Sequence, residues 1–279
     1  MTLQAFVIGW PISHSRSPLI HNYWLEKLQV PGRYERFAVA PPDLLTFLAN
    51  LADLGFVGGN VTLPHKEKAF AACAVTTPVA RQLQAVNTLW IEDEKLFGDN
   101  TDVAGFLASL DADVPDWDKS VDKAVVLGAG GAARGIVFAL NARGIRNIVI
   151  VNRTRSRGEQ LQRQFPDARI DLADFAVLPG LLRDADLLVN TTSLGMIGQP
   201  PLEIDLAPLP ARAVVADIVY APLETALLRQ ASARGLRTSG GLGMLLHQAV
   251  PGFARWFGQT PQVTPDLRAR VAADIADKS

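Results

Sequence analysis

The sequence predicts an α/β protein whose two domains are each built on a sheet of mostly parallel strands. Short apolar runs alternate with amphipathic helical stretches from one end of the chain to the other, which is typical of this class. The chain has 279 residues, enough for about two domains of ~150 residues. Near the middle, an apolar run leads into a glycine-rich turn and a helical stretch. We therefore expect an N-terminal α/β domain and a Rossmann-type doubly wound domain.

The first hundred residues contain the elements of the expected N-terminal domain. Apolar runs at 3–9, 34–39 and 56–63 indicate strands. Helices are expected between these strands, from Ser17 to Leu28 and from Pro42 to Gly55, because a glycine commonly ends a helix.

The expected second domain begins near an acidic segment at 111–122, which contains a proline and no apolar periodicity. Strands are predicted at 123–130, 147–152, 187–192 and 213–220. A long helical stretch at 242–258 follows, with a kink expected after Gln248 because Pro251 and Gly252 interrupt it. A last helix is predicted at 265–276.

Late helices of this kind often return to cover the first domain. We therefore predict a first domain of residues 1–105 that is completed by residues 242–279. Residues 106–241 are predicted to form the Rossmann-type domain.

Composition argues against several classes of function. The formal net charge of −1 gives no electrostatic reason to expect nucleic acid or an anionic membrane as a partner. No apolar run approaches the ~18 residues of a spanning helix. No lysine or arginine precedes Arg16, so the positively charged start of a signal peptide is not expected. Cys73 is the only cysteine and is expected in the core, and the four histidines are scattered, so no metal site is predicted. A cytoplasmic location is expected.

The glycine-rich segment "VVLGAGGAARGIVFAL" matches the dinucleotide fingerprint. Gly128, Gly130 and Ala133 occupy its three positions, for a tight turn, a close approach of backbone to pyrophosphate, and close packing of helix on strand. The helix N-terminus then offers N–H groups to the phosphates. A glycine turn without a ligand is the alternative.

The next predicted strand ends in a basic segment instead of the acidic residue that would bind the ribose of NAD. Asn152, Arg153, Thr154 and Arg155 follow it, and arginine suits bidentate contacts with a phosphate. This segment favours NADP over NAD as cofactor. A solvated basic turn is the alternative, and a methyltransferase, which also uses a glycine loop, has no 2′-phosphate to bind.

The N-terminal stretch "SHSRSP" gathers hydroxyl groups before a helix. Ser15 and Ser17 are two residues apart, so both point to one side of an extended segment. Ser17 is expected to be the N-cap, with Pro18 at the first helical position. Two hydroxyls beside a helix N-terminus predict a cradle for a carboxylate; an ordinary N-cap would explain Ser17 but not Ser15.

Three further residues stand out in the first domain. Lys66 lies in the first turn of a predicted helix, where a cation opposes the helix dipole. Asn87 interrupts an apolar strand, and its amide needs partners there. Asp102 lies at a turn before a predicted helix, in "GDNTDVAGF". A surface lysine and an aspartate that serves only as N-cap are the alternatives.

Together these segments resemble the shikimate dehydrogenase family. The resemblance covers nearly the whole chain in order, through "GWPISHSRSPLIHN", "GGNVTLPHK", "AVNTL", "GDNTDVAGF", "GAGGAAR", "NRTR", "NTTSLGM", "DIVYAPLETALL" and "GGLGMLLHQA". It implies an N-terminal α/β substrate domain, a Rossmann-type NADP-binding domain, and NADP-dependent interconversion of 3-dehydroshikimate and shikimate. This is a step of aromatic amino-acid (chorismate) biosynthesis.

The resemblance also implies roles for residues at matching motif positions. Ser15 and Ser17 would hold the substrate carboxylate, and Lys66 and Asp102 would form the catalytic pair. Contacts to the ring or its hydroxyls would come from Thr62, Asn87, Tyr220 and Gln248. The cofactor would be bound by Gly128, Ala129, Gly130, Gly131, Ala132, Asn152, Arg153, Thr154, Arg155, Thr191, Ser193, Gly241 and Met244.

Loss of a hydride from a secondary alcohol requires that the hydroxyl proton also leaves. We expect Lys66 to exchange this proton and Asp102 to orient it, although a coupled pair leaves the formal base open. A quinate/shikimate dehydrogenase with relaxed cofactor use and an idle NADP-binding regulator are the alternatives. The expected partner is a small molecule, and the expected state is a monomer or homodimer.

Overall fold

The polypeptide chain in the computed structural model, described over residues 2–277, folds as two units that each combine two stretches of sequence. The first unit contains the N-terminal residues up to Asp102 together with Gln248–Val271. The second contains Val103–His247 and the residues from Ala272 onward. Residues 278–279, at the end of the predicted C-terminal part of the first domain, lie outside the described residues.

The first unit is built on a six-stranded mixed sheet in the order β2-β1-β3-β5-β6-β4. Its strands are β1 (Leu3–Gly9), β2 (Gly32–Ala38), β3 (Phe56–Val61), β4 (Val75–Thr76), β5 (Thr88–Glu92) and β6 (Lys95–Asp99). β1 pairs in parallel with β2 and β3, whereas β5 runs antiparallel to both of its neighbours. The expected mostly parallel sheet is therefore parallel mainly in its N-terminal half.

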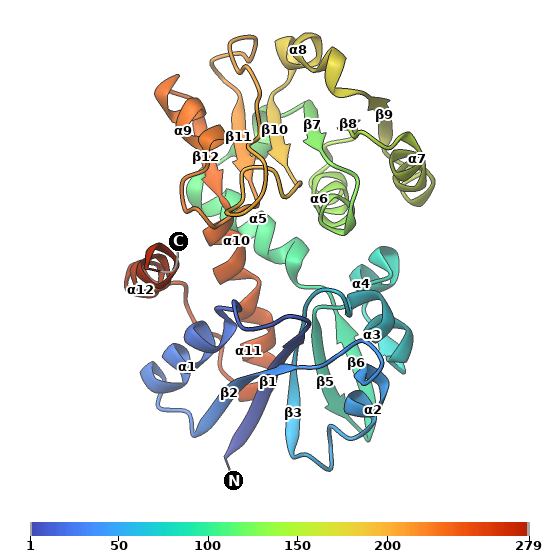
Figure 1. Cartoon of the computed structure of the whole chain (residues 1–279), viewed down its shortest axis with the longest axis vertical. Coiled ribbons are helices and arrows are strands. Elements are labelled where there is room, and N and C mark those ends of the chain that lie inside the picture. The colour runs from blue at the N-terminus through green and yellow to red at the C-terminus, as the bar shows by residue number, and fades with distance from the viewer. Residues whose placement is uncertain (1, 278–279) are drawn as a thin grey trace. The chain divides into compact units, whose positions relative to one another are not determined.

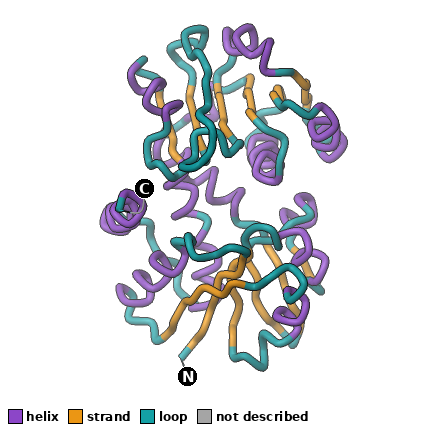
Figure 2. Tube along the Cα trace, in the orientation of Figure 1, coloured by secondary structure: helices purple, strands orange, loops and turns teal. Residues whose placement is uncertain are grey.

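Helices cover both faces of this sheet (Figures 1 and 2). The helices of the first unit are α1 (Ser17–Lys27), α2 (Leu44–Ala49), α3 (Lys66–Ala72), α4 (Pro78–Leu83) and α11 (Ala249–Phe257). α11 packs on β1, β3 and β5 and also contacts α1. Apolar side chains of α2, α3 and α4 join those of β1 and β3 in one core cluster. The C-terminal stretch thus completes the core of the N-terminal unit.

The second unit is built on a six-stranded, fully parallel sheet in the order β12-β11-β10-β7-β8-β9. Its strands are β7 (Lys123–Leu127), β8 (Asn147–Val151), β9 (Arg169–Ala173), β10 (Leu187–Asn190), β11 (Val214–Asp217) and β12 (Arg237–Gly240). This is the strand order of a doubly wound sheet. The strands follow one another toward one edge from β7 to β9 and toward the other edge from β10 to β12, so the order switches between β7 and β10. The predicted Rossmann-type domain is therefore present.

The helices of the second unit flank its sheet (Figure 1). They are α6 (Gly131–Ala142), α7 (Arg155–Gln164), α8 (Leu178–Leu181), α9 (Ala226–Ala233) and α10 (Gly241–His247). α5 (Asp102–Asp113) follows the first unit along the chain, and α12 (Pro265–Ala276) is the last helix. The acidic segment 111–122, expected near the start of the second domain, is helical up to Asp113 and contains a short 3₁₀ turn at Trp117–Ser120.

Several predicted boundaries differ from the structure by a few residues. α1 begins at Ser17 and Arg16 is its N-cap, so the prediction of Ser17 as N-cap is wrong by one position. β5 begins at Thr88, one residue after Asn87. The backbone of Asn87 still bonds to Val61 and Asp99 of the neighbouring strands. The long helical stretch is interrupted at Gln248, where the kink was expected, because α10 ends before this residue and α11 begins after it.

Candidate active site

The ammonium group of Lys66 and the carboxylate of Asp102 form an ion pair in the first unit. Lys66 is the first residue of α3, and Asp102 is the first residue of α5. Lys66 Nζ lies 2.6 Å from Asp102 Oδ2, and the two side chains are 25% and 27% exposed. This partial exposure leaves the pair accessible to a small molecule, while the short contact fixes the ammonium group. Asp102 is thus more than a helix cap.

Asn87 fixes the other oxygen of this carboxylate. Its Nδ2 donates to Asp102 Oδ1 at 2.8 Å and lies 3.4 Å from Gln248 Oε1. Its Oδ1 accepts from the backbone N–H of Thr101 at 2.8 Å and from the Thr88 hydroxyl at 2.9 Å. Because a backbone N–H can only donate, the amide has one possible orientation. Asn87 therefore presents its NH₂ group to Asp102.

Three residues that sequence reasoning did not assign to the site hold this arrangement in place. Thr88, Thr101 and Asn60 are all buried. The Thr101 hydroxyl donates to the Gln248 carbonyl at 2.8 Å, which ties α11 to the site. Asn60 Nδ2 donates to the carbonyl of Asn87 at 2.9 Å. Two of them could have been found from the sequence, because Asn60 in "GGNVTL" and Thr88 in "AVNTL" are polar residues in or beside an apolar strand.

The serine segment lies between β1 and α1. Ser17 is buried and Ser15 is partly exposed. The backbone N–H of Ser17 donates to Ser15 Oγ at 3.3 Å. Arg16 between them has helical backbone angles, so the segment is not the extended stretch that the spacing rule assumed. The two serines are nevertheless neighbours at the N-terminus of an 11-residue helix.

Tyr34 of β2 connects Ser17 with the amide of Asn60. The phenol donates to Asn60 Oδ1 at 2.5 Å. Burial raises the pKa of Tyr34 well above its usual value, against the opposing effect of hydrogen bonds with Ser17 and Asn60. Thr62, one residue after β3, is half-buried, and its backbone N–H bonds to the Ile8 carbonyl at 2.9 Å. The predicted substrate residues Ser15, Ser17, Thr62, Asn87 and Gln248 all belong to the first unit.

The glycine loop of the second unit has the geometry that the fingerprint predicts. Gly128 directly follows β7 with φ +103, which disfavours any residue with a side chain. A Cβ at this position would lie 2.8 Å from Thr191 Oγ1. Ala129 is half-buried, whereas Gly130, Gly131 and Ala132 are exposed, and a Cβ on either glycine would meet open space. The N-terminus of α6 is therefore open for a pyrophosphate, and the loop fits a dinucleotide.

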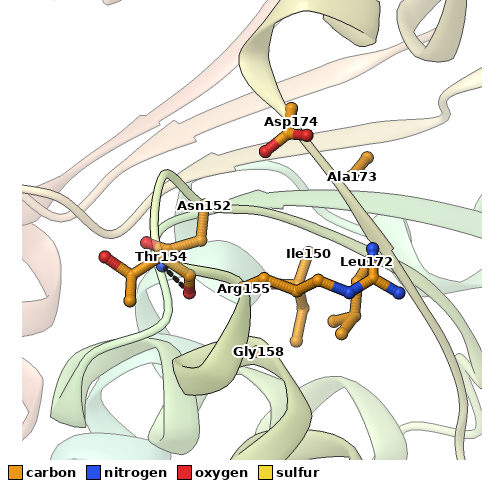
Figure 3. Close-up of a pocket in the computed structure, with 8 residues that line it drawn as sticks. All are labelled: Ile150, Asn152, Thr154, Arg155, Gly158, Leu172, Ala173 and Asp174. Carbon is orange, nitrogen blue, oxygen red and sulfur yellow. Dashed lines mark hydrogen bonds between the residues drawn. The ribbon is translucent and has the colours of Figure 1, made fainter.

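The basic segment after β8 borders a pocket at the carboxyl ends of β8 and β9. Figure 3 shows its lining, which consists of Ile150, Asn152, Thr154, Arg155, Gly158, Leu172, Ala173 and Asp174. Asn152 Nδ2 donates to the Thr154 carbonyl at 2.8 Å, and this bond shapes the turn before α7. The structure thus brings three of the four predicted phosphate-binding residues to one pocket. Arg153 is exposed and does not line it.

One buried carboxylate, Asp217, joins the loops that follow β10 and β11. It accepts hydrogen bonds from Asn190 Nδ2 at 2.9 Å, the Val219 N–H at 3.0 Å and the Thr225 hydroxyl at 2.7 Å. Burial raises the pKa of Asp217, while these three donors oppose the shift. Asn190 Oδ1 in turn accepts from the backbone N–H and the hydroxyl of Thr192. The positions of both loops therefore depend on Asp217.

The remaining predicted residues lie on or beside these loops. Thr191 is buried and donates to the Leu127 carbonyl at 2.6 Å, next to the glycine loop, and Ser193 is exposed. Tyr220 follows β11 in the second unit, apart in sequence from the substrate residues of the first. Gly241 begins α10, and a Cβ there would lie 2.2 Å from the Ile218 carbonyl oxygen. Met244 lies one turn further along α10.

Over residues 2–277, no group of three or more metal-binding side chains comes together. None of the helices in the same range is long and apolar enough to cross a membrane. Cys73 is half-buried rather than fully buried, and burial raises its pKa to about 12.

A doubly wound second unit with an open glycine loop, together with a lysine–aspartate pair in the first unit, is typical of a nicotinamide-dependent oxidoreductase. Three family descriptions match the chain. Residues 7–89 match "Shikimate dehydrogenase substrate binding domain", residues 113–197 match "Shikimate / quinate 5-dehydrogenase", and residues 241–269 match "Shikimate 5'-dehydrogenase C-terminal domain".

Similar proteins agree with these matches. The chain is 63% identical to a shikimate dehydrogenase (NADP(+)) of Methylocella silvestris, over 98% of this chain and 96% of that protein. It is 53% identical to a shikimate dehydrogenase (NADP(+)) of Azorhizobium caulinodans, again over 98% of this chain and 96% of that protein. The chain belongs to the shikimate dehydrogenase family. The predicted family and fold class, and the predicted class of NADP-dependent oxidoreductase, are confirmed.

Solved structures of the same fold have different ligands. A quinate dehydrogenase from Corynebacterium glutamicum in complex with NAD has a TM-score of 0.90 at 30% identity, and 98% of this chain and 99% of that chain are covered. A shikimate 5-dehydrogenase from Thermus thermophilus in complex with NADP(H) and shikimate has a TM-score of 0.86 at 35% identity, and 98% and 100% are covered. Fold alone therefore does not decide between these substrates.

Proposed function

We propose that this chain catalyses the reversible, NADP-dependent reduction of 3-dehydroshikimate to shikimate, with the Lys66–Asp102 pair as its acid–base centre. Identity of 63% to a shikimate dehydrogenase (NADP(+)) supports the reaction. The observation that carries the assignment of residues is the 2.6 Å ion pair, whose carboxylate Asn87 holds from the opposite side. The reaction is a step of aromatic amino-acid biosynthesis.

In this mechanism Lys66 exchanges a proton with the oxygen of the reacting C–O group. Its ammonium donates to the carbonyl oxygen in the direction of reduction and regains a proton from the hydroxyl in the direction of oxidation. The cofactor, when bound, would supply the hydride as NADPH in reduction and accept it as NADP⁺ in oxidation. Asp102 orients the Lys66 amine and balances its charge, and Asn87 orients Asp102. Asp102 is thus a positioning residue for Lys66.

Ser15 and Ser17 are proposed to hold the carboxylate of the substrate. Both lie at the N-terminus of α1, where N–H groups and the helix dipole favour an anion. Thr62, Asn87, Gln248 and Tyr220 are proposed to contact the ring or its hydroxyls. Asn87 and Gln248 support this role because their side-chain amides meet at 3.4 Å beside the ion pair.

The second unit is proposed to bind NADP through two features that fit it. The glycine loop, Gly128, Ala129, Gly130, Gly131 and Ala132, would hold the pyrophosphate at the N-terminus of α6. Asn152, Arg153, Thr154 and Arg155 would hold the 2′-phosphate, for which the guanidinium geometry is suited. Thr191, Ser193, Gly241 and Met244 are proposed to lie near the nicotinamide.

Quinate oxidation is the second candidate, because a quinate dehydrogenase in complex with NAD has the same fold at a TM-score of 0.90. A two-by-two assay separates the candidates: shikimate and quinate are each offered with NADP⁺ and NAD⁺, and nicotinamide absorbance is followed. We expect turnover mainly with shikimate and NADP⁺. Comparable rates with quinate or NAD⁺ would favour the broader dehydrogenase, and binding of cofactor without turnover would favour the regulator.

The proposal includes a cytoplasmic location and a monomeric or homodimeric state, with no nucleic acid as partner. The small substrate and cofactor, and the nearly balanced net charge of −1, support this part of the proposal. Sedimentation analysis of the purified chain would test the oligomeric state, and a larger assembly would contradict it.

A further inference from the structure

The pocket proposed for the 2′-phosphate contains both signs of charge. Arg155 contributes a guanidinium, and Asp174, the residue after β9, contributes a carboxylate (Figure 3). No ion pair joins these two side chains in the described part of the chain. The pocket therefore carries an anionic group of its own, although its expected ligand is a phosphate.

The positive charge of Arg155 is also partly neutralised by a neighbouring glutamate. Arg155 Nε lies 3.2 Å from Glu159 Oε1, one turn further along α7, and the two side chains are 75% and 42% exposed. Counted together, Arg155, Glu159 and Asp174 have a formal charge of −1. Among the residues that line the pocket Arg155 is the one cation, and it is opposed by Asp174 in the lining and by Glu159 on α7; Arg153, also proposed to contact the phosphate, lies outside the lining.

Asp174 has no evident structural task. It is the N-cap residue of a short 3₁₀ turn, yet its side chain makes no capping hydrogen bond. Within the described residues its hydrogen bond is made by the backbone carbonyl, which accepts from the Val177 N–H at 3.2 Å. The exposed carboxylate is therefore free to act on what enters the pocket, and it can be removed without breaking a hydrogen bond of the fold.

We propose that Asp174 lowers the selectivity of this protein for NADP over NAD. The proposal rests on the proposed function, since it takes the 2′-phosphate to lie against Asn152, Thr154 and Arg155. A phosphate monoester carries about −1.5 to −2 charges at neutral pH, so a carboxylate in the same pocket repels it. The uncharged 2′-hydroxyl of NAD meets no such repulsion.

The test compares dissociation constants of NADPH and NADH for the full-length protein and its Asp174→Asn variant. We expect the variant to bind NADPH about three- to tenfold more tightly, which corresponds to one screened charge contact at the surface. Binding of NADH should stay within about twofold, because the opposing charge is absent. The gain for NADPH should shrink at high salt, since both groups are exposed to solvent.

Asp167→Asn is the matched control. Asp167 lies in the turn before β9, at the opposite end of the same strand, and is exposed. This variant changes the net charge equally but should leave the ratio of the two dissociation constants unchanged. A similar gain in both variants would show a general charge effect and overturn the role of Asp174.

Two further outcomes separate this inference from the proposed function. If Asp174→Asn weakens NADPH and NADH equally, Asp174 contacts a part common to both cofactors, such as the adenine amino group, and the inference is wrong. Arg155→Gln should weaken NADPH selectively. If it does so while Asp174→Asn leaves the ratio unchanged, only the inference fails; if it does not, the phosphate lies elsewhere and the pocket assignment fails with it.

Discussion

The two units prepare their ligand sites in different ways. In the first, Lys66, Asp102 and Asn87 are joined by direct hydrogen bonds of 2.6 and 2.8 Å, with buried threonines behind them. In the second, the glycine loop faces open space and Arg155 is 75% exposed. The proposed reacting groups are therefore fixed in advance, whereas the proposed cofactor contacts are open to solvent.

The difference follows from what each site must do. Proton transfer needs a donor held within a few tenths of an ångström, so its partners must be locked by the fold. Binding of a long cofactor would distribute its energy over many contacts, proposed here to be the backbone N–H groups of the glycine loop and the exposed side chains of Arg153 and Arg155. We therefore expect single substitutions in the first site to affect turnover strongly, and single substitutions in the second to affect affinity moderately.

The largest expected effect is that of Lys66→Ala. Removal of the proton-exchanging amine should lower kcat by roughly 10²- to 10⁴-fold, while the dissociation constant of NADPH stays within about twofold. Steady-state rates and a fluorescence titration of NADPH measure the two quantities. Lys68→Ala, an exposed lysine of the same helix, is the control and should keep normal turnover. Near-normal turnover of Lys66→Ala would remove Lys66 from the mechanism.

The buried His21 should make the first unit sensitive to acid. Its ring stacks on Tyr34 at 4.1 Å, and burial lowers its pKa from 6.5 to about 3. Between these values the unfolded chain binds a proton that the folded chain does not. The free energy of unfolding therefore falls as the pH drops below 6.5, by roughly 1.4 kcal/mol per pH unit from this group.

His21→Phe keeps an aromatic ring in the stack and removes this proton uptake. For each protein, the free energy of unfolding at pH 4.5 is compared with its own value at pH 7. We expect the decrease to be about 3 kcal/mol smaller in the variant than in the parent protein. Urea unfolding at both pH values measures the difference. His14→Gln, a change at an exposed histidine, should leave the parent slope intact. Equal slopes for all three proteins would contradict this account of His21.

A smaller effect is expected from Thr225→Val in the second unit. The Thr225 hydroxyl donates to Asp217 and also accepts from the Leu228 N–H as the cap of α9. Loss of both bonds should lower the free energy of unfolding by about 1–3 kcal/mol. Thr225→Ser keeps the hydroxyl and should retain most of the stability in the same urea titration. If serine destabilises as much as valine, the methyl group rather than the hydrogen bonds matters.

The smallest expected effect concerns the pair Arg155–Glu159. Exposed ion pairs contribute about 0.2–1 kcal/mol, so Glu159→Gln should release the guanidinium and tighten NADPH by roughly two- to threefold. Calorimetric titration of NADPH and NADH checks this, with Glu203→Gln, an exposed glutamate elsewhere in the unit, as control. An equal gain for NADH would mean that Glu159 does not act through the phosphate contact.

Sequence reasoning succeeded best where the structure is local. The glycine loop and the basic segment after β8 lie on strand–turn–helix units, so spacing along the chain is enough to place Gly128 and Arg155 in space. The interruption of the helix at Gln248 was expected in the same way, from Pro251 and Gly252. Such features need no knowledge of distant contacts.

The hydrogen bonds that hold the Lys66–Asp102 pair in place could not be predicted from the sequence. Lys66 and Asp102 are 36 positions apart, and only the family resemblance paired them before the structure did. Thr101 and Gln248 are 147 positions apart, and no local pattern indicates their bond. Asp174 was missed because an aspartate after a strand is an ordinary turn residue until a pocket is seen beside it.

Asp217 has a consequence for attempts to redesign this protein. Because a single carboxylate accepts bonds from both Asn190 and Thr225, the segments after β10 and β11 share one anchor. We expect an insertion in one segment to shift the anchor of the other. We therefore expect that engineering of substrate or cofactor preference succeeds better when the two segments are exchanged together with Asp217.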